Sequence, residues 1–197
     1  MPRVPYVSDA AAGPADLVAE IRARRKGALL NLDRMLLHSP ALARGWNAHL
    51  GAVRIGLTVP AKLRELAICA VAVLNEAEYE LAQHLPLFLA AGGSDAAAEA
   101  LRRGDSAWRD QTLFDAVERA VLEVTEEMTR QVRVDDDTFE RARSLLGSDQ
   151  QMVELVSIVA TYNMVSRFLV ALGVDAEGEG PGVGAGAAAG AHKGSQR

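Results

Sequence analysis

The sequence predicts an all-α protein, and three observations support this fold class. Apolar residues recur at helical spacing through most of the chain, residues typical of helix ends separate these segments, and no segment that alternates with a period of two is bounded as a hairpin. We therefore expect a compact, multi-helix single domain over residues 14–175, preceded by a flexible N-terminus at residues 1–13. The Gly/Ala-rich residues 176–197 cannot bury enough apolar surface to offset their backbone entropy, so we expect a disordered tail.

A first helix is predicted to open near Pro14, because proline in the first turn loses no hydrogen bond. The two segments that follow it are expected to form an antiparallel helical pair. Leucines from Leu29 to Leu36 then recur at helical spacing, Ser39 and Pro40 interrupt them, and the pattern resumes from Ala41 to Val53.

The central helices carry most of the apolar residues. We predict one helix from Pro60 to about Leu74 and a second from Glu76 to Ala91, ended by Gly92 and Gly93. Pro86 lies inside the second helix and lacks the amide that would bond the carbonyl four residues earlier, so a kink is expected there.

Four further helices are expected in the second half, each with an apolar face or a capping residue at its start. They are a short helix capped by Ser94 or Asp95 and ending near Arg103, a helix from Phe114 to Arg130, a helix capped within Asp135–Asp137 that runs to Leu146, and a last helix from about Gln150 to Leu172 capped by Ser148 or Asp149.

Composition indicates an ordinary globular protein of 197 residues with 49% hydrophobic residues and a net charge of -5. That charge disfavours non-specific binding to nucleic acid or to an anionic membrane. No apolar run approaches the roughly 20 residues of a membrane span, and the start lacks the apolar core of a signal peptide, so a cytoplasmic location is the default. The basic cluster Arg22, Arg24, Arg25 and Lys26 is interpreted as a solvated helix end in preference to a patch for phosphate or an acidic partner.

Polar groups inside the central apolar helices identify a candidate site. Glu80 and His84 are four residues apart and share a helix face, where a carboxylate and an imidazole can exchange a proton with each other or with a ligand. Glu65 lies on the preceding helix. We predict no metal, because two ligands are too few and neither Glu-x-x-His nor His-Glu-x-x-His occurs.

Structural interpretations of the same residues stay open. Arg64 and Glu65 could form a surface or interhelical ion pair, Glu80 could belong to a solvated acidic face with Tyr79 packed on a neighbour, and His84 could be a buried histidine that bonds a backbone carbonyl.

A polar group also occurs on the last predicted helix. Tyr162, Asn163 and Arg167 are interpreted first as structural or subunit-interface groups and second as pocket lining.

Three stretches, PAKLRELAI, LNEAEYELAQH and LAAGGSDAAAEAL, resemble the carboxymuconolactone decarboxylase and alkylhydroperoxidase D-like superfamily, and the likeness extends from Leu29 to Asp175. The resemblance implies a small helical domain with a pocket near the motif helix, self-associated as a trimer or a hexamer. Large apolar helix faces agree with such assembly.

Peroxidase-type members of that superfamily carry Cys-x-x-Cys-x-x-x-His and an upstream glutamate. Here Glu65 and His84 match, but Ala77 and Glu80 occupy the cysteine positions. Peroxide reduction through a disulfide cycle needs both thiols, so we do not expect it, although a peroxiredoxin label could follow from family membership. The single cysteine, Cys69, lies in an apolar segment where burial would raise its thiol pKa and keep it inert.

Decarboxylase-type members also lack the cysteine pair and use no cofactor. The resemblance therefore implies a cofactor-free proton-transfer enzyme, a decarboxylase (lyase) or an isomerase, that acts on a small carboxylate or lactone. His84 would be the acid or base, Glu80 would orient it, and Glu65 would be a second carboxylate whose pKa burial raises. The substrate-binding candidates are Tyr79, Arg64, Arg167, Tyr162 and Asn163.

Two other functions remain open from the sequence. The domain could be a non-catalytic oligomeric module that binds a small ligand or acts as a scaffold, or it could retain antioxidant activity through Cys69. The first alternative would gain support if Glu65, Glu80 and His84 diverged or were sealed without a cavity.

Overall fold

The computed structural model describes residues 1–178, apart from the side chains of residues 105 and 106, and this part of the chain is helical with no strand. Of the tail predicted to be disordered, residues 176–197, the part from 179 onward lies outside the described residues. At its start, Glu177 accepts hydrogen bonds from the Asn31 amide and the Tyr79 hydroxyl. The helices are α1 (Ala15–Arg24), α2 (Asn31–Leu36), α3 (Pro40–Ile55), α4 (Ala61–Leu74), α5 (Glu78–Ala90), α6 (Asp95–Arg103), α7 (Asp105–Trp108), α8 (Ala116–Gln131), α9 (Asp136–Leu146) and α10 (Asp149–Leu172), with a short 3-10 helix at Asp9–Ala11.

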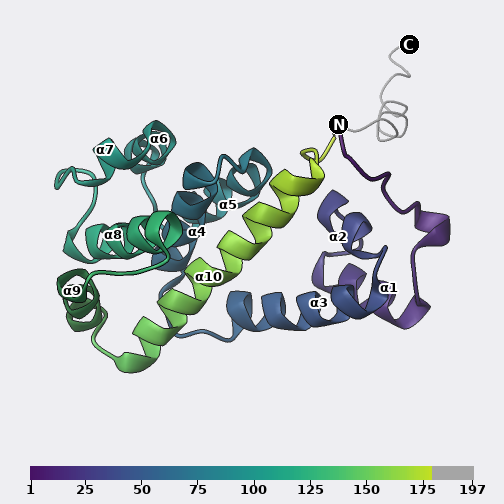
Figure 1. Cartoon of the computed structure of the whole chain (residues 1–197), viewed down its shortest axis with the longest axis horizontal. Helices are drawn as coiled ribbons and strands as arrows, with labels where there is room; N and C mark the ends of the chain where they lie inside the picture. The colour runs from purple at the N-terminus through teal and green to yellow at the C-terminus, as the bar shows by residue number, and fades with distance from the viewer. Residues whose placement is uncertain (179–197) are drawn as a thin grey trace, which may run out of the picture.

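Helix α10 runs diagonally across the molecule and joins its two ends (Figure 1). Helices α1 to α3 lie on one side of it, α6 to α9 lie at the other end, and α4 and α5 lie between them. The all-α class predicted from the sequence is confirmed.

Helix α4 forms the centre of the core. Residues 65–72 are all buried, because α5, α8 and α10 pack around this helix. A helix that is apolar on every side requires such enclosure, and its alanines let the neighbours approach closely. Glu65 lies within this buried segment, so its carboxylate is held inside the protein.

A tight turn brings α5 back against α4. Glu76 adopts a left-handed φ of 53°, and the amide of Ala77 donates to the carbonyl of Ala72 at 2.8 Å. At the far end of α5, the amide of Gly93 donates to the carbonyl of Phe88 at 2.9 Å, and a Cβ on Gly93 would lie 2.4 Å from the Phe88 ring. The glycine pair therefore ends α5 where the sequence predicted.

Several helix caps agree with the sequence, and others differ. The Ser94 and Ser148 hydroxyls each accept a hydrogen bond from the amide three residues on, at 3.1 Å, as predicted. Asp135 precedes α9 but makes no side-chain cap bond. Asp115 and Glu118 form a reciprocal capping box at the start of α8, which we did not predict. The short helix α7 was also not predicted.

The first residues contact the end of the domain. The Arg3 amide donates to the Leu172 carbonyl at 2.8 Å, and the Met1 ammonium lies 2.9 Å from a carboxylate oxygen of Asp175. The segment that we expected to be flexible thus lies against the end of α10.

By length and composition, α10 is the one helix of the described chain that could cross a membrane, with a mean hydropathy of 1.6 over its most apolar window. Half of that window is buried inside the domain, where α10 packs against α3, α4, α8 and α9. A central core helix meets the same criterion, so the finding is weak evidence for a membrane span.

Candidate active site

A cavity of about 450 Å³ opens between α4 and α5 on one side and the ends of α1, α2 and α3 on the other. Its size suits a small organic molecule. The lining residues are Arg25, Leu30, Leu32, Arg54, Ala61, Arg64, Glu65, Tyr79, Glu80, Gln83, His84, Leu87, Ala90 and Ala91.

The three acid–base residues predicted from the sequence meet in this cavity. His84 Nδ1 lies 2.7 Å from Glu65 Oε2, and His84 Nε2 lies 3.2 Å from Glu80 Oε1. All three side chains are buried, with at most 4% of each residue exposed. Glu80 and His84 share a face because they are one turn apart on α5, and α4 supplies Glu65 from the core.

The two carboxylates favour a positively charged His84. Burial by itself would lower the pKa of His84, but hydrogen bonds to Glu65 and Glu80 and their negative charges raise it above its ordinary value. For Glu65, burial would raise the pKa, as we predicted, yet the hydrogen bond to His84 and the charges of His84 and Arg64 lower it overall. Glu65 is therefore held ionised, and the expected role of Glu65 as a proton donor with a raised pKa is wrong.

Glu80 is the member of this group that can meet a ligand. Both ring nitrogens of His84 face carboxylates, so His84 has no free nitrogen to offer, and the interpretation that it bonds a backbone carbonyl is excluded. Glu80 Oε2 is buried and has no hydrogen-bond partner. A buried carboxylate oxygen without a partner is costly unless a ligand or water donates to it. Glu80 does not belong to a solvated face, although its neighbours Glu76 and Glu78 are exposed.

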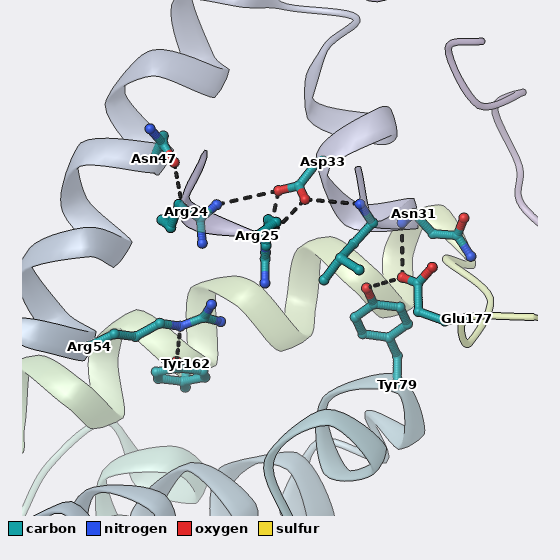
Figure 2. A network of polar contacts seen from close by, with 10 residues as sticks. Arg24, Arg25, Asn31, Asp33, Asn47, Arg54, Tyr79, Tyr162 and Glu177 are labelled. Carbon is teal, nitrogen blue, oxygen red and sulfur yellow. Dashed lines mark hydrogen bonds and ion pairs between the residues drawn. The ribbon is translucent and has the colours of Figure 1, made fainter. Parts of the chain in front are cut away.

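The other candidates on α4 and α5 also border the cavity. Arg64 lines it, and its Nε donates to Glu65 Oε1 at 3.2 Å. The pair lies within α4 and Glu65 is buried, so it is neither a surface nor an interhelical ion pair, and substrate binding by Arg64 stays a prediction. The Tyr79 hydroxyl donates to Glu177 Oε1 at 2.6 Å, and the same oxygen accepts from the Asn31 amide at 2.9 Å (Figure 2). Tyr79 is therefore engaged at the edge of the cavity by the segment that follows α10.

The three candidates on α10 do not line the cavity. Tyr162 packs edge-on against the His84 ring, with 5.0 Å between ring centroids. Asn163 donates to Thr129 Oγ1 at 2.9 Å and accepts from Arg167 at 3.0 Å, in a polar network that links helices α8 and α10. Asn163 and Arg167 thus match the structural interpretation, and Tyr162 supports the site from behind.

Sequence reasoning missed Arg54 and Gln83 and discounted Arg25, although all three line the cavity. Arg54 donates through Nε to the Tyr162 hydroxyl at 3.0 Å. Burial raises the pKa of Tyr162 to about 12, against the opposing charge of Arg54. The position of Gln83 directly before His84 on α5 could have drawn attention to Gln83. No local sequence pattern around Arg54 could have identified Arg54.

Cys69 is fully buried on α4. Burial raises the pKa of its thiol far above the ordinary range, and the negative charges of Glu65 and Glu80 raise it further. Such a thiol is a poor nucleophile. Among residues 1–178, no group of three or more His, Cys, Asp or Glu side chains is arranged to hold a metal ion.

Comparison with known proteins identifies a family match over part of the chain and a shared fold. A family model for the Carboxymuconolactone decarboxylase family matches residues 40–127. An alkylhydroperoxidase AhpD core structure, an uncharacterized peroxidase-related protein from Ralstonia eutropha JMP134, superposes with a TM-score of 0.76 at 21% identity over 90% of this chain and 93% of that one.

Two further solved structures show the same fold. A peroxidase-related protein from Silicibacter sp. TM1040 gives a TM-score of 0.73 at 20% identity, covering 90% of this chain and 95% of that one. A variant of the debrominase Bmp8 in complex with 2,3,4-tribromopyrrole gives a TM-score of 0.74 at 16% identity, covering 89% of this chain and 91% of that one. No curated protein matches the sequence.

The family match covers α3 to most of α8, which includes the two helices that carry Glu65, Glu80 and His84. The superposed structures extend the shared architecture to nine-tenths of the chain. Residues 40–127 therefore match the carboxymuconolactone decarboxylase family, within a chain that has the alkylhydroperoxidase D-like fold and lacks the Cys-x-x-Cys pair.

Proposed function

We propose that this protein is a cofactor-free proton-transfer enzyme, a decarboxylase or an isomerase, that acts on a small carboxylate or lactone. The observation that carries the proposal is the buried chain Glu65–His84–Glu80, which ends at an unpartnered carboxylate oxygen beside the cavity. Acid–base groups in a cavity with a shifted pKa are typical of catalytic sites. A disulfide-cycle peroxidase is not supported, because the residues at the thiol positions are Ala77 and Glu80.

In this mechanism, Glu80 exchanges the proton with the substrate and His84 supplies or stores it. For decarboxylation, the bond from carbon to the leaving carboxylate breaks, carbon dioxide departs, and the electron pair stays on carbon as an enolate. Glu80, having taken a proton from the His84 imidazolium, delivers it to that carbon. For isomerisation, Glu80 removes a proton from one carbon and returns it to another.

Glu65 acts through His84 in either reaction. Its ionised carboxylate holds the imidazole in one orientation and stabilises the imidazolium, so Glu65 is a positioning residue. This division of roles differs from the sequence hypothesis, in which Glu80 oriented His84.

The test is turnover of a panel of small carboxylates and lactones, followed by mass spectrometry for loss of carbon dioxide and by NMR for isomers. We expect wild-type turnover of at least one compound and a loss of about 100-fold or more in Glu80→Gln, since general acid–base catalysis contributes about 10²- to 10⁴-fold. The matched control, Glu99→Gln, changes an exposed glutamate on α6 and should keep full activity. Equal rates in Glu80→Gln and the control would overturn the proposal.

A non-catalytic ligand-binding or scaffold module is the second candidate. What favours it is that both nitrogens of His84 are engaged by carboxylates, as in a purely structural ion pair. This alternative predicts that ligands bind the cavity without chemical change, and that Glu80→Gln alters affinity alone.

The proposal also includes self-association as a trimer or a hexamer, a cytoplasmic location, and no nucleic-acid or membrane partner. Support for assembly comes from large apolar side chains that are more than half exposed, Ile55 and Val153 among them.

A further inference from the structure

Three arginines, Arg24, Arg25 and Arg54, lie close together beside the cavity, and two of them, Arg24 and Arg25, share the carboxylate of Asp33. Asp33 Oδ1 lies 3.4 Å from an Arg24 terminal nitrogen, and Asp33 Oδ2 lies 3.1 Å from Arg25 Nε. Asp33 is 2% exposed, and the arginine side chains are less than a fifth exposed. Arg54, the third, bonds only the neutral Tyr162 hydroxyl, so its terminal nitrogens have no partner within residues 1–178.

Figure 2 shows how these side chains lie. Arg24 and Arg25 reach down from the α1 end, Arg54 reaches in from α3 above Tyr162, and Tyr79 rises on the opposite side of the open region between them. Arg25 and Arg54 both line the cavity that also contains Glu80.

The charges around the cavity do not balance. At the α4–α5 wall, Arg64 and the imidazolium of His84 offset the carboxylates of Glu65 and Glu80. At the arginine wall, Asp33 pairs with Arg24 and Arg25 and makes no ion pair with Arg54, so the three guanidinium groups outnumber this carboxylate. The charges of Glu80 and Glu65 also act on Arg54, but Arg64 and His84 already offset them, so positive charge remains in excess. Burial, together with repulsion from Arg25 and Arg54, lowers the pKa of Arg24 to about 10, which is a sign of this crowding. Half-buried cations without partners are costly, so a site of this kind fits a bound anion.

The remaining lining shows which kind of anion suits the site. Leu30, Leu32 and Leu87 form apolar walls beside the guanidinium groups. An inorganic ion would leave these walls unmet, whereas an organic acid would place its carboxylate on the arginine fork and its carbon skeleton on the leucines.

We propose that Arg54 and Arg25 form a carboxylate subsite of the cavity, which holds a small organic acid with its reacting carbon toward Glu80. Binding of the organic acid does not depend on catalysis. What this binding implies about the substrate of the reaction rests on the proposed function. A guanidinium pair stabilises a carboxylate that keeps its charge, and so opposes loss of that group as carbon dioxide. A substrate that is decarboxylated here must therefore carry a second carboxylate in addition to the one that the arginines hold.

The subsite draws partly on a segment outside the family match. Arg25 and Asp33 precede residue 40, where the match begins, whereas Arg54 and the acid–base residues lie within it. The end of α1 and the end of α3 would then hold the substrate carboxylate, while α4 and α5 supply the chemistry.

Calorimetric titration with glutarate, butyrate and inorganic phosphate tests the subsite. We expect wild type to bind the two organic acids more tightly than phosphate, and Arg54→Gln to raise their Kd about tenfold or more through loss of charge-assisted hydrogen bonds. Arg54→Lys, which keeps the charge without the fork, should fall between the two. Arg133→Gln makes the same charge change at an exposed position outside the cavity and should leave the Kd unchanged.

Several results would overturn the inference. They are the absence of organic-acid binding to wild type, an unchanged Kd in Arg54→Gln, and tighter binding of phosphate than of both acids. If Arg54→Gln does not fold by circular dichroism, Arg25→Gln takes its place with the same expectation. Glu80→Gln separates the two proposals, because this variant should still bind the organic acids. If wild type and Glu80→Gln both bind the acids and neither turns over any compound, the proposed function is wrong and the carboxylate subsite is still supported.

Discussion

Replacement of Glu65 by glutamine tests whether this carboxylate maintains the charge of His84. The substitution keeps the shape of the side chain and a hydrogen bond to Nδ1 at 2.7 Å, but it removes the negative charge. A charge-assisted hydrogen bond contributes about 1.5–3 kcal/mol, and a neutral one about 1 kcal/mol. Both partners are at most 4% exposed, so solvent screens the pair little. We therefore expect Glu65→Gln to lower the free energy of unfolding by about 0.5–2 kcal/mol.

The assay combines urea unfolding with an NMR titration of the His84 ring protons. In Glu65→Gln the pKa of His84 should fall relative to wild type, because one of the two carboxylates that raise it is gone. Glu99→Gln is the matched control: its ion pair with Arg102 is exposed on α6, so its effect should stay within about 0.5 kcal/mol. An unchanged His84 pKa, or equal stabilities in the two variants, would refute the reasoning.

Three further predictions follow from single features. Because the pKa of His84 is raised in the folded protein, the protonated imidazole stabilises the fold fully at pH values below its ordinary pKa of 6.5, and this stabilisation is lost as pH rises through the higher folded pKa. The stability difference between wild type and His84→Gln should therefore shrink above that pH. A difference that grows with pH would contradict this prediction. Cys69 should resist thiol reagents in the native protein and react only on unfolding, and Cys69→Ser should leave any peroxide consumption unchanged; rapid native labelling would contradict its burial. Sedimentation should detect a trimer or a hexamer that Ile55→Ser weakens, and a wild-type monomer would contradict self-association.

Much of the fold could be predicted from the sequence, because it depends on local signals. Pro14, Ser94, Ser148 and the Gly92–Gly93 pair mark helix ends through their own backbone or side-chain chemistry, and the structure places helix ends beside each of them. The short helix α7 was missed because four residues give too little periodicity to detect.

The candidate site was only partly predictable. The spacing of Glu80 and His84 on one helix is visible in the sequence, and the superfamily motif associated Glu65 with them. The pKa of Glu65 was predicted in the wrong direction, since burial was considered without the partner charge on His84 that outweighs it. Arg54 and Asn163 show the other limit: which of two polar residues faces a cavity depends on how distant helices pack, and that information is not local.

Proton exchange at carbon tests the central claim most directly. Small dicarboxylates and carboxylated lactones would be incubated in deuterium oxide with wild type, Glu80→Gln or Glu99→Gln, and carbon-bound deuterium would be followed by NMR. The account predicts incorporation with wild type and with Glu99→Gln, and none above background with Glu80→Gln. Incorporation at the wild-type rate by Glu80→Gln would contradict it, as would bound acids that never exchange with the wild-type protein.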